Sequence, residues 1–183
     1  MNSINIYTDG ACSGNQHKEN LGGWGAILVY KEHKKELYGA EANTTNNRME
    51  MKAVLEALKL LKKEDFIVNI FSDSSYLIEC FTKKWHVKWQ QNGWLTASKK
   101  PVENKELWQA LLEEIHKQKQ INFYRVKGHL NINSSSQMEQ WYKKFTQWNG
   151  THFSMDDFIY VTKMNIHADA LANKGVDSLK IEG

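Results

Sequence analysis

The sequence contains little of what marks secreted, membrane or disulfide-stapled proteins. It has one proline and two cysteines in 183 residues, and Cys12 and Cys80 lie too far apart to form a CxxC pair. No run of about twenty apolar residues is present, so we expect no membrane-spanning helix and no membrane partner. The N-terminus lacks the basic, apolar and small-residue pattern of a signal peptide. We therefore expect a reduced, cytoplasmic protein.

The composition that remains is that of one ordinary globular domain. A chain of 183 residues fits one domain and buries roughly 70% of its unfolded surface. We find no linkers or internal repeats and treat residues 1–183 as a single domain. The formal net charge of +3 is a weak sign of an anionic partner, and the distribution of charge is more informative than its sum. We expect a monomer with no obligate protein partner.

Tryptophan and lysine are concentrated in one segment. Four of the seven tryptophans fall between positions 85 and 108: Trp85, Trp89, Trp94 and Trp108. The same segment carries Lys83, Lys84, Lys88, Lys99, Lys100 and Lys105. Aromatic rings interleaved with lysines suit a polyanion that offers flat bases and sugars. A solvated amphipathic helix with a tryptophan core explains the same pattern equally well.

Hydrophobic periodicity predicts strands that give way to alternating helices and strands. We expect strands near residues 3–8, 22–30, 35–42, 66–72 and 121–126. We expect helices near residues 46–62, 74–84, 104–118 and 166–176. The first three strands should form an antiparallel meander. Helices separate the later strands, so strands one, four and five should run parallel in a mixed sheet of the α/β class.

Residues 131–163 interrupt this rhythm and are called the insert below. The stretch "SQMEQWYKKFTQW" predicts a helix that starts at a capping box formed by Ser136 and Glu139. The stretch "DFIYVT", residues 157–162, is typical of a strand. The apolar spacing favours packing as the role of the insert. Contact with a substrate is the alternative, through Trp141, Lys143 or Lys144.

The stretch "YTDGACSGN", residues 7–15, places an aspartate at the end of the first strand and follows it with small side chains. Aspartate and glycine form turns, so a hairpin turn is one explanation. A ligand site is the other, because small residues let the backbone of a substrate come close to Asp9.

Three further acids lie at comparable places: Asp73 after the fourth strand, Glu50 one turn into the first helix and Asp169 near the start of the last helix. Singly, each has an ordinary explanation as a cap, a surface residue or a helix-start residue. Together, four converging carboxylates would repel one another unless a divalent cation neutralised them. An all-oxygen ligand set favours Mg²⁺ or Mn²⁺, and four carboxylates are enough for two ions roughly 3.5–4 Å apart.

Six stretches, in this order, resemble the signature of the type 1 ribonuclease H family. They are "YTDGACSGN", "TTNNRMEM", "FSDSSYL", "NGWLTASKKPVENKELW", "VKGH" and "NIHADALA". The resemblance covers about residues 3–130 and 164–176. It implies a ribonuclease H-like fold with helices on both faces of a five-stranded mixed sheet. It also implies a two-metal-ion endonuclease that hydrolyses the RNA strand of RNA–DNA hybrids and leaves 5′-phosphate and 3′-hydroxyl ends.

The resemblance also implies roles for particular residues. The carboxylates would hold two Mg²⁺ ions, for which Mn²⁺ can substitute, and the metal ligands are Asp9, Glu50, Asp73 and Asp169. His129 would assist proton transfer or the release of product and metal. Contacts with the RNA are implied for Gly10, Ala11, Cys12 and Ser13. Contacts with the DNA strand are implied for Asn15, Thr45, Asn46 and Asn47, and along a basic protrusion for Trp85, Lys88, Trp89, Trp94, Lys99 and Lys100.

The insert departs from the family pattern because it separates His129 from Asp169, which many members join by a short flexible loop. An ordered insert could hold or shield His129. Two other readings stay open: a non-catalytic hybrid-binding module on the same fold, and a DNA-strand-transferring enzyme on the related integrase-like fold. The intact set of four acids argues against the first reading. The phosphate pocket at "TTNNRMEM" and the basic protrusion disfavour the second.

Overall fold

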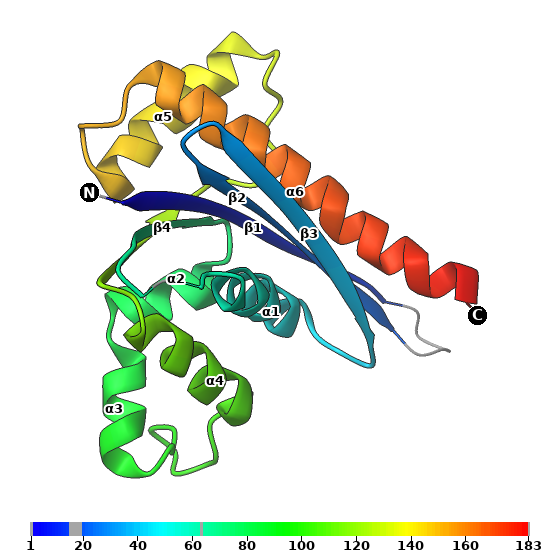
Figure 1. The fold of residues 1–183 in the computed structure, drawn as a ribbon, viewed down its shortest axis with the longest axis vertical. Coiled ribbons are helices and arrows are strands. Elements are labelled where there is room, and N and C mark those ends of the chain that lie inside the picture. The colour runs from blue at the N-terminus through cyan, green and yellow to red at the C-terminus, as the bar shows by residue number, and fades with distance from the viewer. Residues whose placement is uncertain (1, 15–19, 63, 183) are drawn as a thin grey trace.

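The computed structural model describes residues 2–14, 20–62 and 64–182 as a five-stranded sheet with helices on both faces (Figure 1). The strands are β1 (Ser3–Ser13), β2 (Leu21–Tyr30), β3 (His33–Ala42), β4 (Ile67–Ser72) and β5 (Gln120–Arg125). The helices are α1 (Asn46–Lys59), α2 (Ser75–Thr82), α3 (Trp85–Asn92), α4 (Lys105–His116), α5 (Ser135–Asn149) and α6 (Met155–Glu182). No helix in these described ranges combines the length and the apolar character needed to cross a membrane.

The strands lie in the order β3-β2-β1-β4-β5, which confirms the predicted mixed sheet. β1, β2 and β3 form an antiparallel meander, whereas β4 and β5 join β1 in parallel. Because β1 and β4 are parallel and adjacent, the chain leaves β4 beside the middle of β1. That edge of the sheet is where ligands bind in open α/β folds.

The first strand is longer than predicted. β1 continues to Ser13 and pairs with β2 from Asn5 to Ser13, so Asp9 does not end the strand. The hairpin-turn explanation for residues 9–13 is therefore wrong. What ends near Asp9 is the parallel pairing with β4, whose last pair is Thr8 with Ser72. Beyond that point β1 is free on one side, which opens the space next to Asp9.

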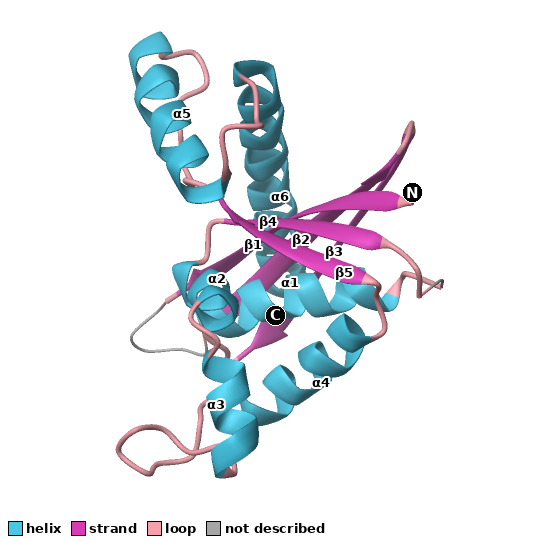
Figure 2. Ribbon diagram, turned by 90° about the vertical axis from the view of Figure 1, so that its left-hand side faces the viewer, coloured by secondary structure: helices cyan, strands magenta, loops and turns pink. Residues whose placement is uncertain are grey.

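Successive side chains of the central strands point to opposite faces of the sheet and so build two cores, one on each face. Ile6 and Ile70 face α1, α2 and α4, and they pack with Trp108 in the first core. Tyr7 and Phe71, each the next residue along, face α5 and α6 in the second core. This is the two-residue period of a strand that is covered on both faces. Figure 2 shows the sheet between these two helical layers.

The insert is a structural layer of the second core. Phe71 stacks on Tyr7 and on Tyr124 of the neighbouring strands, with ring centroids 5.0 Å apart in both pairs. Phe145 of α5 and Phe158 of α6 belong to the same core as these stacked rings and are almost fully buried. Packing is thus one role of the insert.

Two details of the insert were predicted wrongly. Residues 157–162 are not a strand but lie in the first turns of α6, which runs unbroken into the predicted last helix. A run of β-branched and aromatic residues does not distinguish a strand from a buried helix by itself. The cap of α5 is Ser134, whose side chain accepts from the backbone N–H of Gln137, and not Ser136. The helix that "SQMEQWYKKFTQW" predicts is confirmed.

Candidate active site

Two neighbouring strands bring the first two acids together. Thr8 and Ser72 are paired in the parallel register of β1 and β4, so Asp9 and Asp73 are each the next residue after that pair. Strand direction alone thus places two carboxylates at one point. Asp73 leads directly into α2, whose N-cap Ser74 accepts from the N–H of Leu77 at 3.1 Å.

Two glycines beside Asp9 allow helices to deliver the other acids. A Cβ on Gly10 would lie 2.7 Å from the backbone nitrogen of Glu50, so only glycine lets α1 come this close. Gly25 pairs with Asp9 across the β1–β2 ladder, and a Cβ there would meet the carbonyl of Ala168, the neighbour of Asp169. The residues next to Asp9 are therefore small because of packing. They let the two helices that carry Glu50 and Asp169 come close to the sheet.

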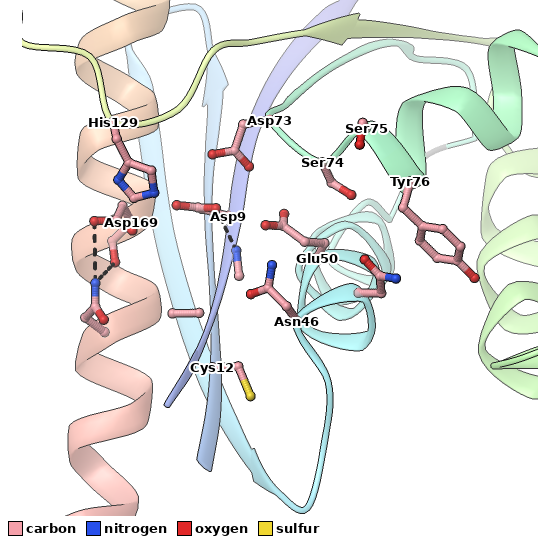
Figure 3. Close-up of a pocket in the computed structure, with 14 residues that line it drawn as sticks. Asp9, Cys12, Asn46, Glu50, Asp73, Ser74, Ser75, Tyr76, His129 and Asp169 are labelled. Atoms are coloured by element: carbon pink, nitrogen blue, oxygen red, sulfur yellow. Dashed lines mark hydrogen bonds between the residues drawn. The ribbon is translucent and has the colours of Figure 1, made fainter. Parts of the chain in front are cut away.

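The side chains converge as the sequence suggested (Figure 3). Carboxylate oxygens of Asp9, Glu50 and Asp73 lie within 4.8 Å of one another. Asp169 lines the same pocket from α6 and is held by Asn173, whose side-chain amide donates to its carbonyl at 3.0 Å and to its Oδ2 at 3.4 Å. The pocket has a volume of about 520 Å³. We call it the acidic pocket.

Burial raises the pKa values of the three grouped acids, and repulsion between them raises those of Asp9 and Glu50 further. Burial raises the pKa of Asp9 from 3.8 to about 8, with a further increase from the charge of Asp73, although the N–H of Gly10 donates to Oδ1 at 2.9 Å and opposes it. Burial and the charges of Asp73 and Asp9 raise the pKa of Glu50 well above its usual range. Burial also raises the pKa of Asp73, against an opposing hydrogen bond from Asn165 of α6 and the nearby His129.

The donor set fits a hard divalent cation. Asp9 and Glu50 are each only 3% exposed. One oxygen of Glu50, Oε2, is buried and has no hydrogen-bond partner in the described part of the chain. A buried acceptor without a donor is costly, and a cation would satisfy it. Carboxylate oxygens alone are the ligands of Mg²⁺ and similar ions rather than of soft metals.

His129 reaches the pocket from the loop after β5. It is exposed and has a left-handed backbone with φ of 60°. Its two flanks are anchored, because Val126 and Leu130 are buried in the second core. The side chain lies at the rim between Asp73 and Asp169 (Figure 3). The insert thus holds the base of this loop and leaves the imidazole accessible.

Comparison with known proteins decides the family. A family model described as RNase H matches residues 1–179. The chain is 57% identical over 126 residues to a ribonuclease H of Caldanaerobacter subterraneus subsp. tengcongensis, a match that covers 69% of this chain and 79% of that protein. The chain belongs to the type 1 ribonuclease H family. It is therefore a nuclease enzyme.

Solved structures of ribonucleases H share the fold. LC9-RNase H1, a type 1 RNase H with the type 2 active-site motif, superposes with a TM-score of 0.70 at 24% identity, over 97% of this chain and 73% of that one. LC11-RNase H1, solved in complex with an RNA/DNA hybrid, gives a TM-score of 0.60 at 18% identity, over 96% of this chain and 98% of that one.

The residues predicted to contact substrate divide into three groups. Those that line the acidic pocket are Gly10, Ala11, Cys12, Asn46 and Asn47. Ser13 and Thr45 lie beside it but are engaged in the fold: the hydroxyl of Ser13 donates to the carbonyl of Leu21 at 3.3 Å, and Thr45 caps α1 by accepting from the N–H of Arg48 at 3.2 Å. Asn15 lies outside the described residues.

The third group forms the protrusion of this ribonuclease H, made of α3 and the loop to α4. Trp85, Trp89 and Trp94 are half-buried and pack against the first core, and Trp89 lies 5.6 Å from the ring of Trp108. Lys88, Lys99 and Lys100 are exposed on the surface of the protrusion. The structure therefore shows the tryptophan core and the solvated lysines of the second explanation, and binding of a polyanion stays a prediction.

Sequence reasoning missed four residues of the acidic pocket, namely Ser74, Ser75, Tyr76 and Asn173. The three from α2 follow Asp73 directly, so the strand-to-helix turn that positions the acid was a signal for them. Asn173 lies one helical turn after Asp169, and the four-residue spacing of a helix face could have identified it.

Proposed function

We propose that this enzyme is an endonuclease that hydrolyses the RNA strand of RNA–DNA hybrids and leaves 5′-phosphate and 3′-hydroxyl ends. The observation that carries the proposal is the convergence of three buried carboxylates within 4.8 Å in a pocket that Asp169 and His129 also line. A protein that only bound nucleic acid would gain nothing from carboxylates that repel phosphate. The LC11 neighbour was solved with an RNA/DNA hybrid, which supports the same substrate class.

We propose two Mg²⁺ ions as the cofactor, with Mn²⁺ as a substitute, held by Asp9, Glu50, Asp73 and Asp169. The raised pKa values of the grouped acids and the unpartnered Oε2 of Glu50 support this assignment. When bound, the ions supply positive charge to the scissile phosphate and activate the attacking water. The four acids come from two strands and two helices of a packed sheet, which holds them in place before substrate arrives.

Other residues of the pocket would bind and orient the RNA. Glu50 can accept from a 2′-hydroxyl, the group that distinguishes RNA from DNA. Ala11 and Cys12 have little bulk and leave the minor groove room to approach. His129 would deliver a proton to the departing 3′ oxygen, or help product to leave, since its imidazole is accessible and its loop is anchored. The opening motif thus serves both packing and substrate access.

The DNA strand would run from Asn46 and Thr45 at the start of α1 to the lysines of the protrusion. Residues 1–183 would act as one domain, with the insert at about 131–163 as part of it. A monomeric, cytoplasmic protein belongs to the same proposal, and the free thiols of Cys12 and Cys80 are consistent with a reducing compartment.

A cleavage assay tests the proposal. The substrate is a hybrid with end-labelled RNA, with Mg²⁺ or EDTA, beside matched RNA and DNA duplexes. We expect RNA fragments from the hybrid alone and only with Mg²⁺. Tight hybrid binding without cleavage would instead indicate a binding module, and cleavage of the DNA duplex would indicate the integrase-like alternative.

A further inference from the structure

A second cavity adjoins the acidic pocket at Ser75 and reaches the C-terminal end of α2, which leads into the protrusion. It has a volume of about 250 Å³ and lies between α2 and the end of β5, where α5 packs. Its lining includes Ser75, Lys83, Arg125 and Trp148, and Ser75 also lines the acidic pocket. We call it the Arg125 groove. In both ribbon views α5, α2 and α3 follow one another down one side of the molecule, so the groove continues the face that carries the protrusion (Figures 1 and 2).

Arg125 is presented by the insert as a rigid cation. Its guanidinium carbon lies 4.4 Å from the centroid of the Trp148 ring. The side chain of Asn149 accepts from the backbone N–H of Arg125 at 2.9 Å and donates to its carbonyl at 2.8 Å. Two adjacent residues of α5 thus fix the backbone and the side chain of the last residue of β5. Stacking covers one face of the guanidinium and leaves its N–H edge free.

The guanidinium has no anionic partner in the part of the chain that the structure describes. Among residues 2–14, 20–62 and 64–182, no acid pairs with Arg125 and no acceptor takes its guanidinium N–H groups. The acid of the groove, Glu79, is already 3.6 Å from Lys83 and so is partly neutralised. Lys127, two residues on, is exposed over the ring of Trp141 at 5.1 Å. The local balance is positive, although the acidic pocket next to it is strongly negative.

We propose that the Arg125 groove binds a phosphate of the RNA strand beyond the scissile position. The proposal rests on the function proposed above, because the RNA strand occupies the adjoining pocket. Arg125 and His129 are four residues apart, a span of at most about 14 Å, which corresponds to roughly four nucleotides at about 3.4 Å each. Arginine suits this role because its N–H edge matches two phosphate oxygens at once.

The contact would give the insert a second role besides packing. α5 supplies Trp148 and Asn149, which hold the arginine in place, so side-chain entropy is lost during folding rather than during binding. An arginine that merely packs against tryptophan would need no neighbouring cavity that shares Ser75 with the acidic pocket. The groove therefore assigns the insert to substrate binding through Arg125 rather than through Lys143 or Lys144.

The test measures binding of a fluorescent RNA–DNA hybrid in EDTA, where no cleavage occurs, from 50 to 200 mM salt. Arg125→Gln should weaken binding about tenfold at low salt and lower the slope of log K against log salt by about 0.7–0.9. Arg125→Lys should keep the slope and recover part of the affinity. Lys35→Gln, an exposed lysine on β3 at the opposite edge of the sheet, is the matched control. Equal effects of Arg125→Gln and Lys35→Gln would overturn the proposal.

A second experiment tests which strand of the hybrid Arg125 contacts. Neutral methylphosphonates, placed one at a time in the RNA strand, should include one position at which wild type and Arg125→Gln bind alike. Finding that position only in the DNA strand would overturn the RNA assignment. Cleavage by the wild-type chain in Mg²⁺ is scored separately. Absence of cleavage with an intact Arg125 effect would reject the proposed function alone, and cleavage without an Arg125 effect would reject the groove alone.

Discussion

The acidic pocket and the Arg125 groove share Ser75 but carry charged groups of opposite sign in opposite settings. In the pocket, like charges are buried together at the junction of two strands and two helices. In the groove, Arg125 is held against Trp148, and no acid among the described residues pairs with it. The first arrangement is unstable until a cation arrives, whereas the second is ready for phosphate. One nucleic acid would therefore meet a site that depends on metal and a site that does not.

The largest expected difference between the two regions is in catalysis. Loss of a group that only supports a metal ligand costs roughly 10–100-fold, so Asp73→Asn, which removes a proposed ligand, should lower kcat by more than about 100-fold. Arg125→Gln should leave kcat at saturating hybrid unchanged and raise KM. Steady-state cleavage in Mg²⁺ measures both. An Asp73→Asn enzyme with wild-type kcat would remove Asp73 from the site.

The next difference is in stability without metal. The pKa of Asp9 is raised to about 8 in the folded chain from an ordinary value of 3.8. An acid whose folded pKa is raised stabilises the fold in its protonated form, and this contribution is lost as pH rises from about 4 through 8. Asp9→Asn should therefore stabilise the metal-free protein at pH 8, by an amount on the order of a few kcal/mol, and have little effect at pH 4.

Denaturant unfolding in EDTA at the two pH values checks this expectation. Arg125→Gln, which does not touch the acidic pocket, is the control and should show no such pH dependence. A destabilising effect of Asp9→Asn at pH 8 would mean that the carboxylate is needed for the fold and not only for its ligand.

Binding of Mg²⁺ should relieve the repulsion between the buried acids and so stabilise the fold. A ligand that binds only the folded state at about 100 times its Kd stabilises it by about 2.7 kcal/mol. We expect a rise in Tm with Mg²⁺ for the wild type and for Arg125→Gln. Glu50→Gln should show a much smaller rise, because it removes the charge of the buried acid whose Oε2 has no partner. Calorimetry at several Mg²⁺ concentrations measures this, and an equal rise for Glu50→Gln would place the ion elsewhere.

Much of the acidic pocket could be predicted from the sequence, because its residues are marked by local sequence signals. Element order implied a parallel β1 and β4, and hence the meeting of Asp9 and Asp73. Glu50 and Asp169 came from their places in predicted helices, and the family resemblance joined the four. The packing role of Gly25 was not accessible, since it depends on which residue of β2 pairs with Asp9 and which turn of α6 crosses it.

The insert was the hardest segment to interpret, and the Arg125 groove depends on it. Residues 157–162 carry apolar residues that suit a strand or a helix, and only burial in the second core, where Phe158 packs against Tyr142 and Phe145, decides for the helix. Arg125 lies in a predicted strand and Trp148 in a predicted helix. Their stacking is a tertiary contact between segments that no periodicity relates.

The smallest expected effect concerns the other side of the acidic pocket, where Thr45 caps the helix that carries Glu50. Its side chain accepts from the N–H of Arg48, and removal of such a cap costs about 1 kcal/mol. Thr45→Ala should therefore lower stability by that amount, whereas Thr45→Ser should preserve it. If Thr45 also binds a DNA phosphate, Thr45→Ala will weaken hybrid binding as well, whereas Thr45→Ser will not. Unchanged hybrid binding by Thr45→Ala would leave Thr45 as a cap alone, and Arg125 would then be the better placed of the two for phosphate binding, because its guanidinium donors have no acceptor among the described residues.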